Sequence, residues 1–222
     1  MKIGRLLEFR SYGSLLLTLL FVSVAYPVLQ NYPGLRVVTG FLFVVTLLVA
    51  LRAVAKNRQQ VIVSTLIAVI GIAGFAGELL NPGSVWRLAY LLGFSLFFLY
   101  ASSLMLIDIL GRSQRVDADL IFGAIGVYLV IGLFFAFAFA LLEVLMPGSV
   151  SGVSELVGDN ATAGPMIYFS YVTLTTLGYG DVTPVTNMAM SMSYAEAIIG
   201  QLFLAILVAR LVGLHIAGGT ES

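Results

Sequence analysis

The residues TLTTLGYGD, from Thr173 to Asp181, combine small hydroxyl side chains, two glycines and an acid inside an otherwise apolar chain. Gly178 and Gly180 permit backbone angles that other residues avoid. With them, successive carbonyl groups can point toward one axis. Carbonyl oxygens are hard, partly negative ligands, and a ring of them from several chains can replace the hydration shell of a monovalent cation. The strip therefore predicts a site that coordinates cations through its backbone.

The composition indicates an integral membrane protein. Of 222 residues, 60% are hydrophobic and 10% are charged, whereas soluble domains carry about a quarter charged residues. The apolar runs are continuous, which favours helices over the alternating strands of a barrel. A formal net charge of +0 gives no general attraction for nucleic acid. The absence of cysteine and the single histidine exclude disulfides, thiol catalysis and cysteine or histidine metal clusters.

Six apolar stretches are expected to span the membrane as helices, since a span needs roughly 20 residues. They are Ser14–Leu29, Val37–Ala55, Val61–Leu80, Val85–Leu110, Leu120–Met146 and Met188–Ile216. The first is the shortest, and we interpret it as a retained helix because no small-residue cleavage site precedes Tyr26-Pro27.

A seventh segment, Pro165–Thr175, is too short to span. It opens at Gly164-Pro165, and proline suits the first helical turn. About ten helical residues rise only about 15 Å. This segment predicts a helix that enters half of the membrane and ends at the polar strip.

Basic residues predict the orientation, because cytoplasmic loops are enriched in lysine and arginine. With the N-terminus inside, the outer ends of the spans hold only Arg36 and Arg87. The cytoplasmic segments hold Lys2, Arg5, Arg10, Arg52, Lys56, Arg58, Arg112, Arg115 and Arg210. We expect a multi-pass protein of the plasma membrane with both termini in the cytoplasm and the strip entering from outside.

The strip resembles the potassium channel signature T-T-V-G-Y-G-D, and the resemblance extends from about Leu120 to Ile216. It implies a homotetramer around one pore, bound K⁺ ions and no other cofactor. The expected ligands are the Thr176 hydroxyl and the carbonyls of Thr176, Leu177, Gly178 and Tyr179. Gly180 is the last residue of the expected filter. The alternative is a glycine-rich extracellular turn.

This sequence departs from the family pattern at the filter and in the pore helix. Leu177 replaces the usual valine, which bears on selectivity. Thr175 and Asp181 flank the strip as supporting residues. In relatives a pore-helix tryptophan donates to the acid after the filter, and here Tyr168 holds that position, so its hydroxyl could bind Asp181. Val172 stands where some relatives carry a glutamate.

The last helix is expected to line the inner cavity. Gly200 matches the hinge glycine of the family, and a packing notch between helices is the alternative. The residues that follow it at helical spacing could face the cavity: Gln201, Leu204, Ala205, Val208 and Val212. The last three could form small apolar rings near the inner mouth that gate by dewetting. Glu196, an acid at membrane depth, could support the filter through a pore-helix hydroxyl or the filter backbone.

The first four helices (residues 1–115) are expected to form a peripheral domain that does not sense voltage, and residues 116–222 the pore domain. A sensor needs arginines at every third position, but the fourth span has only Arg87 at its outer end and Asp108 at its inner end. Glu78 could pair with Arg87, although snorkelling of both to headgroups is the favoured interpretation.

Other polar residues give weaker indications. Glu143, Glu155 and Asp159 could make an acidic outer mouth that concentrates cations, or an ordinary solvated loop. His215 could sense protons, but an interfacial histidine is favoured.

The function expected is passive, potassium-selective conduction that depends little on voltage, by a protein that is not an enzyme. The partners are other copies of the chain, membrane lipids and K⁺, with no nucleic acid and no ligand-binding cytoplasmic domain in this chain. The alternatives are a nonselective cation channel, arising from Leu177, and the membrane subunit of a potassium transporter.

Overall fold

The computed structural model describes residues 11–29, 35–54, 57–111, 118–153 and 163–219, and the fold is almost entirely helical. The helices are α2 (Ser11–Leu29), α3 (Arg36–Val54), α4 (Arg58–Leu80), α5 (Ser84–Gly111), α6 (Ala118–Leu145), α8 (Ala163–Leu174) and α9 (Asn187–Gly219). Two short strands, β1 (Val150–Ser151) and β2 (Thr183–Pro184), complete the described elements.

The long helices coincide with the six apolar stretches, and their ends differ by a few residues. Four helices are long and apolar enough to cross a membrane: α4, α5, α6 and the Asn187–Arg210 part of α9. The apolar stretches in α2 and α3, Tyr12–Tyr26 and Val37–Ala50, are shorter. The chain is thus a multi-pass membrane protein. The expected domain boundary between residues 115 and 116 lies outside the described residues.

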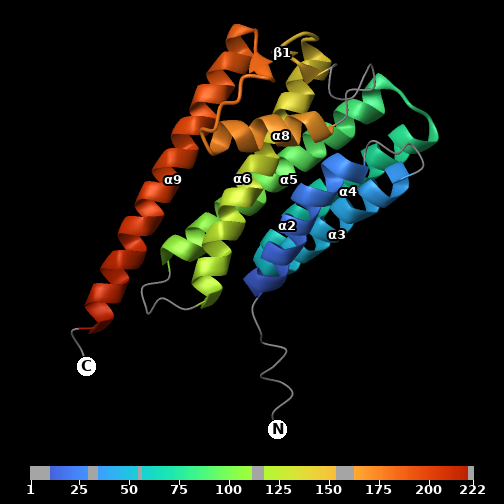
Figure 1. The fold of residues 1–222 in the computed structure, drawn as a ribbon. Coiled ribbons are helices and arrows are strands. Elements are labelled where there is room, and N and C mark those ends of the chain that lie inside the picture. Colours follow the sequence, from blue (N-terminus) through green and yellow to red (C-terminus); the bar gives the residue numbers. More distant parts are fainter. Residues whose placement is uncertain (1–10, 30–34, 55–56, 112–117, 154–162, 220–222) are drawn as a thin grey trace.

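The helices form a slanted bundle from which α9 diverges (Figure 1). The blue helices α2 and α3 and the cyan α4 lie on the side of the bundle away from α9, while α8 has one end beside α9 and runs crosswise over α6. The beginning of α2 and the end of α9 lie at the same end of the molecule, opposite the β1–β2 ribbon.

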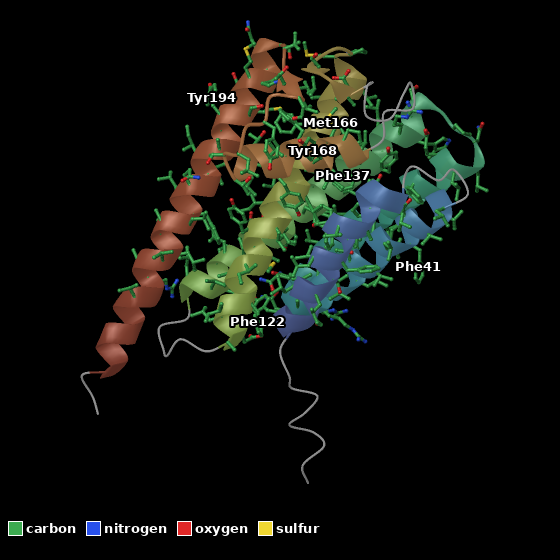
Figure 2. The ribbon with its side chains drawn as sticks, in the orientation of Figure 1. Phe41, Phe122, Phe137, Met166, Tyr168 and Tyr194 are labelled. Atoms are coloured by element: carbon green, nitrogen blue, oxygen red, sulfur yellow. The ribbon has the colours of Figure 1, made fainter. Side chains whose placement is uncertain are left out.

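Aromatic side chains join the first helices to α6. Phe137 of α6 sits in the bundle interior (Figure 2), with its ring centroid 5.3 Å from that of Phe43 of α3. The centroids of Phe94 and Phe98 of α5 lie 5.2 and 5.7 Å from it. Phe94, Phe98 and Phe137 are almost fully buried. Offset and edge-to-face pairs each contribute about 0.5–1.5 kcal/mol beyond the area they bury, so this cluster fixes α3 and α5 against α6.

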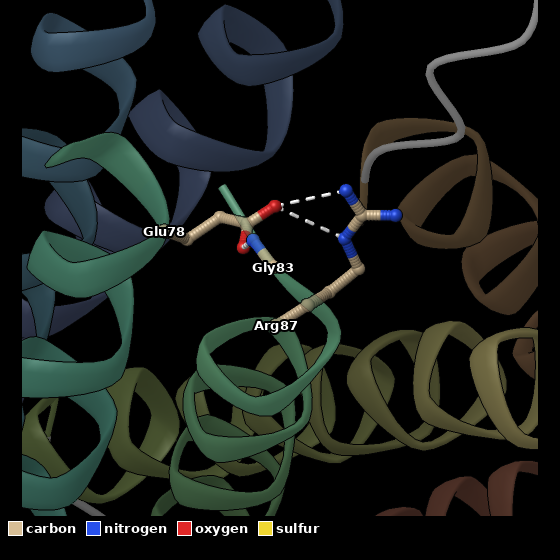
Figure 3. Close-up of polar contacts among 3 residues, drawn as sticks. All are labelled: Glu78, Gly83 and Arg87. Carbon is tan, nitrogen blue, oxygen red and sulfur yellow. Dashed lines mark hydrogen bonds and ion pairs between the residues drawn. The ribbon is translucent and has the colours of Figure 1, made fainter. Parts of the chain in front are cut away.

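The turn between α4 and α5 is closed by an ion pair that the sequence did not favour. The Glu78 Oε1 atom lies 2.9 Å from Arg87 Nη2, and Glu78 Oε2 accepts the Gly83 N–H at 2.9 Å (Figure 3). The preferred expectation, snorkelling of both side chains, was wrong because the tight Asn81-Pro82-Gly83 turn brings the two helix ends together. A partly exposed pair of this kind contributes at most about 1 kcal/mol.

Past α6, the chain turns back and pairs with the segment that precedes α9. Val150 pairs with Pro184 and Ser151 with Thr183 in an antiparallel ribbon. Glu143 accepts the N–H groups of Gly148 at 2.6 Å and Val150 at 3.0 Å. Its carboxylate therefore braces this turn, which differs from both roles expected of it. Glu155 and Asp159, and the side chain of His215, lie outside the described residues.

Candidate functional site

Helix α8 is fixed to α6 by three hydrogen bonds. The Ser170 hydroxyl lies 2.7 Å from the Gly132 carbonyl oxygen, and the Tyr171 hydroxyl donates to the Leu129 carbonyl at 3.0 Å. In the opposite direction, the Tyr128 hydroxyl of α6 donates to the carbonyl of Leu174 at 3.0 Å. Gly132 makes this approach possible, because a Cβ atom there would overlap the Tyr171 ring.

A second contact connects α8 with the first helix. The Tyr171 hydroxyl lies 3.0 Å from the Ser23 hydroxyl of α2. Since Tyr171 donates its single proton to Leu129, Ser23 is the donor to Tyr171. The position of α8 is therefore set from two sides.

The segment Thr175–Asp181, which we call the glycine segment, leaves α8 with an alternating backbone. Thr176, Gly178 and Gly180 have φ values of 58°, 58° and 81°, whereas Leu177 and Tyr179 between them have negative φ. Such alternation in the sign of φ is a pattern in which successive N–H groups can gather on one side of the chain and the carbonyls on the other. Positive φ is uncommon for a threonine, so Thr176 is held in a strained conformation by its surroundings.

The N–H groups at the start of the glycine segment bond back to α8. Thr176 donates to the Thr173 carbonyl, and Leu177 donates to the Val172 carbonyl, each at 2.9 Å. Within the part of the chain that the structure describes, no hydrogen bond is donated to the carbonyls of Leu177, Gly178 or Tyr179. These acceptors thus remain available to a ligand.

The far end of the glycine segment is held by Tyr168 of α8. Its hydroxyl donates to Asp181 Oδ2 at 2.6 Å, as expected from the position of the two residues in the sequence. This hydrogen bond lowers the pKa of the Asp181 carboxyl below its ordinary value of 3.8. Asp181 Oδ1 accepts the N–H of Val182 at 3.0 Å, so both carboxylate oxygens have partners.

Helix α9 contacts both α8 and the start of the glycine segment. Gly200 is buried where a Cβ atom would overlap the Leu174 carbonyl oxygen, so α8 and α9 pack closely there, as in the packing notch that the sequence offered as the alternative to a hinge. The Gln201 amide Nε2 lies 3.1 Å from Thr176 Oγ1. Glu196, with no exposed surface, bonds to the Ser170 hydroxyl at 2.5 Å rather than to the backbone of the glycine segment.

The remaining cavity candidates lie on the exposed flank of α9. Leu204, Ala205, Val208 and Val212 are all exposed in the single chain. Figure 2 shows Tyr194 projecting from α9 away from the other helices. The side chains of Leu177 and Tyr179 are likewise exposed, by 59% and 67%. A large apolar surface is thus left uncovered on the side of the molecule that carries α9.

Three residues of this site were not identified from the sequence. Ser170 was anticipated only as an unspecified hydroxyl of the short helix, and Tyr128 and Tyr171 were not anticipated. Each is an ordinary polar residue in an apolar helix, a pattern that does not reveal which neighbour it meets. Ser170 alone carries a signal, because a buried acid such as Glu196 needs a hydrogen-bonding partner.

Residues 124–215 match a family model described as "Ion channel". The matched segment runs from α6 to α9 and includes α8 and the glycine segment, and it is less than half of the chain. No curated protein matches the chain significantly. The similarity supports an ion channel domain in this part of the molecule.

Proposed function

We propose that four copies of this chain surround one pore and conduct potassium ions selectively and passively across the membrane. Each chain contributes six spans, with α8 as the pore helix and the glycine segment as the selectivity filter. Residues 116–222 form the pore domain. Residues 1–115 form a peripheral domain without a ladder of arginines, so opening depends little on membrane potential.

The observation that carries the proposal is the alternating backbone of the glycine segment. Its carbonyls accept no hydrogen bond from the described residues, and Leu177 and Tyr179 are exposed. Non-helical backbone at membrane depth is tolerated only inside protein or along water, because unpaired polar groups are costly in hydrocarbon. A ring of four such segments would line a path for ions, with the carbonyls of Thr176 to Tyr179 as ligands.

The assembly is supported by the exposed face of α9. Leu202, Ile206 and Val208 are 56%, 57% and 58% exposed in the single chain. This apolar face continues into the exposed glycine segment, which lipid cannot cover without leaving its carbonyls unpaired. Four inner helices facing one another would instead form a cavity lined by Gln201, Leu204 and the residues that follow them.

The location of the protein follows from the same proposal. The beginning of α2 and the end of α9 lie at one end of the molecule (Figure 1). The excess of lysine and arginine supports the proposal that this end lies in the cytoplasm and that the channel belongs to the plasma membrane. The glycine segment then opens toward the outside.

Substitution of Gly178 tests the function directly. Its φ of 58° strains any side chain, so Gly178→Ala should abolish potassium flux into proteoliposomes while the tetramer still assembles. Gly148→Ala is the matched control, because Gly148 has a φ of 82° and, like Gly178, has no atom within 4 Å of an added Cβ. Equal potassium flux in the two variants would show that the glycine segment is not the selectivity filter.

The same preparation separates the alternatives. Flux of sodium equal to that of potassium would identify a nonselective cation channel and point to Leu177. Transport without single-channel steps in planar bilayers would identify a transporter subunit.

A further inference from the structure

The buried carboxyl of Glu196 lies at the centre of a contact between three helices. Glu196 of α9 and Ser170 of α8 have no exposed surface. The Ser170 Oγ atom lies 2.5 Å from Glu196 Oε1 and 2.7 Å from the carbonyl oxygen of Gly132 on α6. Glu196 Oε2 is buried and has no hydrogen-bond partner among the described residues.

The number of protons that this contact needs indicates whether the Glu196 carboxyl is neutral or ionised. A serine hydroxyl has one proton to donate, and a backbone carbonyl has none. Two contacts this short among three oxygens need two protons, because a single shared proton leaves one pair of oxygens in repulsion. If Ser170 donates to Gly132, the second proton belongs to Glu196, which donates it to Ser170 Oγ. The geometry therefore fits a neutral carboxylic acid.

The surroundings of Glu196 agree with a neutral group. The titratable side chains that interact with it electrostatically are Tyr128 of α6 and Tyr171 of α8. Both hydroxyls already donate to carbonyls, those of Leu174 and Leu129. No ion pair joins Glu196 to a cationic group of the described residues. An ionised carboxylate here would be buried without compensation, with Oε2 unpaired.

We propose that Glu196 is a positioning residue that holds the pore helix through its proton, and that loss of this proton at alkaline pH stops conduction. This inference rests on the proposed function. The neutral acid joins α9 to Ser170, and Ser170 joins α8 to α6. Since the glycine segment begins one turn beyond Ser170, at the end of α8, this contact sets the position of the filter. Ionisation would turn the Ser170 hydroxyl toward the carboxylate, which then accepts its proton. The Gly132 carbonyl would be left facing Ser170 Oγ with no proton between them, so α8 would lose this contact with α6.

Potassium flux between neutral pH and about pH 10, a range in which buried carboxyl groups can ionise, tests the proposal. Wild-type flux should fall as the pH rises. Glu196→Gln, which keeps the size of the side chain and a donor N–H, should conduct at every pH in the range. Glu196→Ala should conduct about tenfold less at every pH, as expected when a buried polar group loses its partner. The variants retain Tyr128 and Tyr171, which controls for tyrosine titration.

A second measurement does not depend on conduction. The infrared spectrum of purified wild-type protein at neutral pH should contain the carbonyl band of a protonated carboxylic acid, and Glu196→Gln should lack it. Absence of the band, or the same alkaline loss of flux in Glu196→Gln as in wild type, would overturn the inference. Absence of wild-type flux at neutral pH would instead contradict the proposed function, and the infrared result would still decide the state of Glu196.

Discussion

At the scale of single residues, the glycine segment is held at both ends by side chains. Tyr168 bonds to Asp181 at its far end, and Gln201 lies 3.1 Å from the Thr176 hydroxyl at its beginning. Between these points the sign of φ alternates along the backbone, and the carbonyls accept no hydrogen bond from the described residues. Because so few internal hydrogen bonds hold this strip, it can distort, and we expect the contacts at its two ends to keep it in the ordered form.

Removal of the Tyr168 hydroxyl should favour the distorted form. We expect Tyr168→Phe to assemble normally, because the ring remains, but to spend several-fold more time non-conducting at steady state, since a charge-assisted hydrogen bond is lost. Single-channel open times and the decay of macroscopic current measure this. Tyr100→Phe on α5 is the control, because no hydrogen bond of its hydroxyl is found with the described residues. Open times equal to wild type in Tyr168→Phe would require another donor for Asp181.

The lowered pKa of Asp181 gives this bond a defined pH dependence. The carboxyl has its lower pKa in the folded protein because Tyr168 stabilises the charged form. The contribution of the bond is therefore complete above the ordinary value of 3.8 and is lost only as the pH falls through the lower folded-state value. Mild acid should leave the gating of wild type and of Tyr168→Phe equally unchanged.

At the scale of the elements, α9 is organised around its contact with the end of α8. Glu196, Gly200 and Gln201 lie within five positions of one another and meet Ser170, Leu174 and Thr176 in the same order. Two hydrogen bonds thus flank one close backbone approach. Movement of α9 would act on α8 and on the glycine segment together.

Substitution of Gly200 distinguishes packing from hinge bending. A Cβ atom at Gly200 would overlap the Leu174 carbonyl oxygen, so Gly200→Ala should lower thermal stability. Gly213→Ala is the matched control on the same helix, because an added Cβ there meets no atom within 4 Å. This control should gain up to about 1 kcal/mol from helix propensity. Thermal unfolding in detergent measures both variants, and equal or greater stability of Gly200→Ala would contradict the packing role.

The sequence predicted elements better than it predicted partners. Continuous apolar runs and Gly164-Pro165 were enough to locate the long helices and α8, because burial in lipid and the geometry of proline act locally. The pair of Tyr168 and Asp181 was also predicted. Both residues belong to one short stretch that resembles known channels, and in those channels the residue at the position of Tyr168 donates to the acid.

Partners on different helices were predicted at most as one of two alternatives. Glu196 was expected to bond to a hydroxyl of the pore helix or to the backbone of the filter, and the structure shows a bond to a hydroxyl, that of Ser170. The bond between Ser170 and Glu196 depends on how α8 and α9 are turned about their axes relative to each other. The pattern of apolar residues in neither helix indicates that orientation. Glu143 was expected to face ions or solvent, yet it braces a turn whose shape only the structure gives. The pair of Glu78 and Arg87 depended on the angle of one tight turn.

At the scale of the whole molecule, the described helices of the single chain leave part of its apolar surface uncovered. Its glycine segment and the apolar flank of α9 share one uncovered side, while α2 to α5 pack against the other helices through a buried aromatic cluster. The first helices thus stabilise α6, and α6 in turn positions α8. In the proposed tetramer, four copies of this exposed side would face one another around the pore.

The reversal potential of purified protein in planar bilayers, with potassium on one side and sodium on the other, tests the central claim most directly. If four glycine segments form a filter of carbonyl oxygens suited to dehydrated K⁺, current should reverse at a strongly displaced potential that changes with potassium concentration and not with sodium concentration. Because the first four helices carry no ladder of arginines, the channel should conduct across the whole voltage range, and current can be recorded on both sides of the reversal potential. A reversal potential near zero would show that the pore does not distinguish the two cations and would contradict the account.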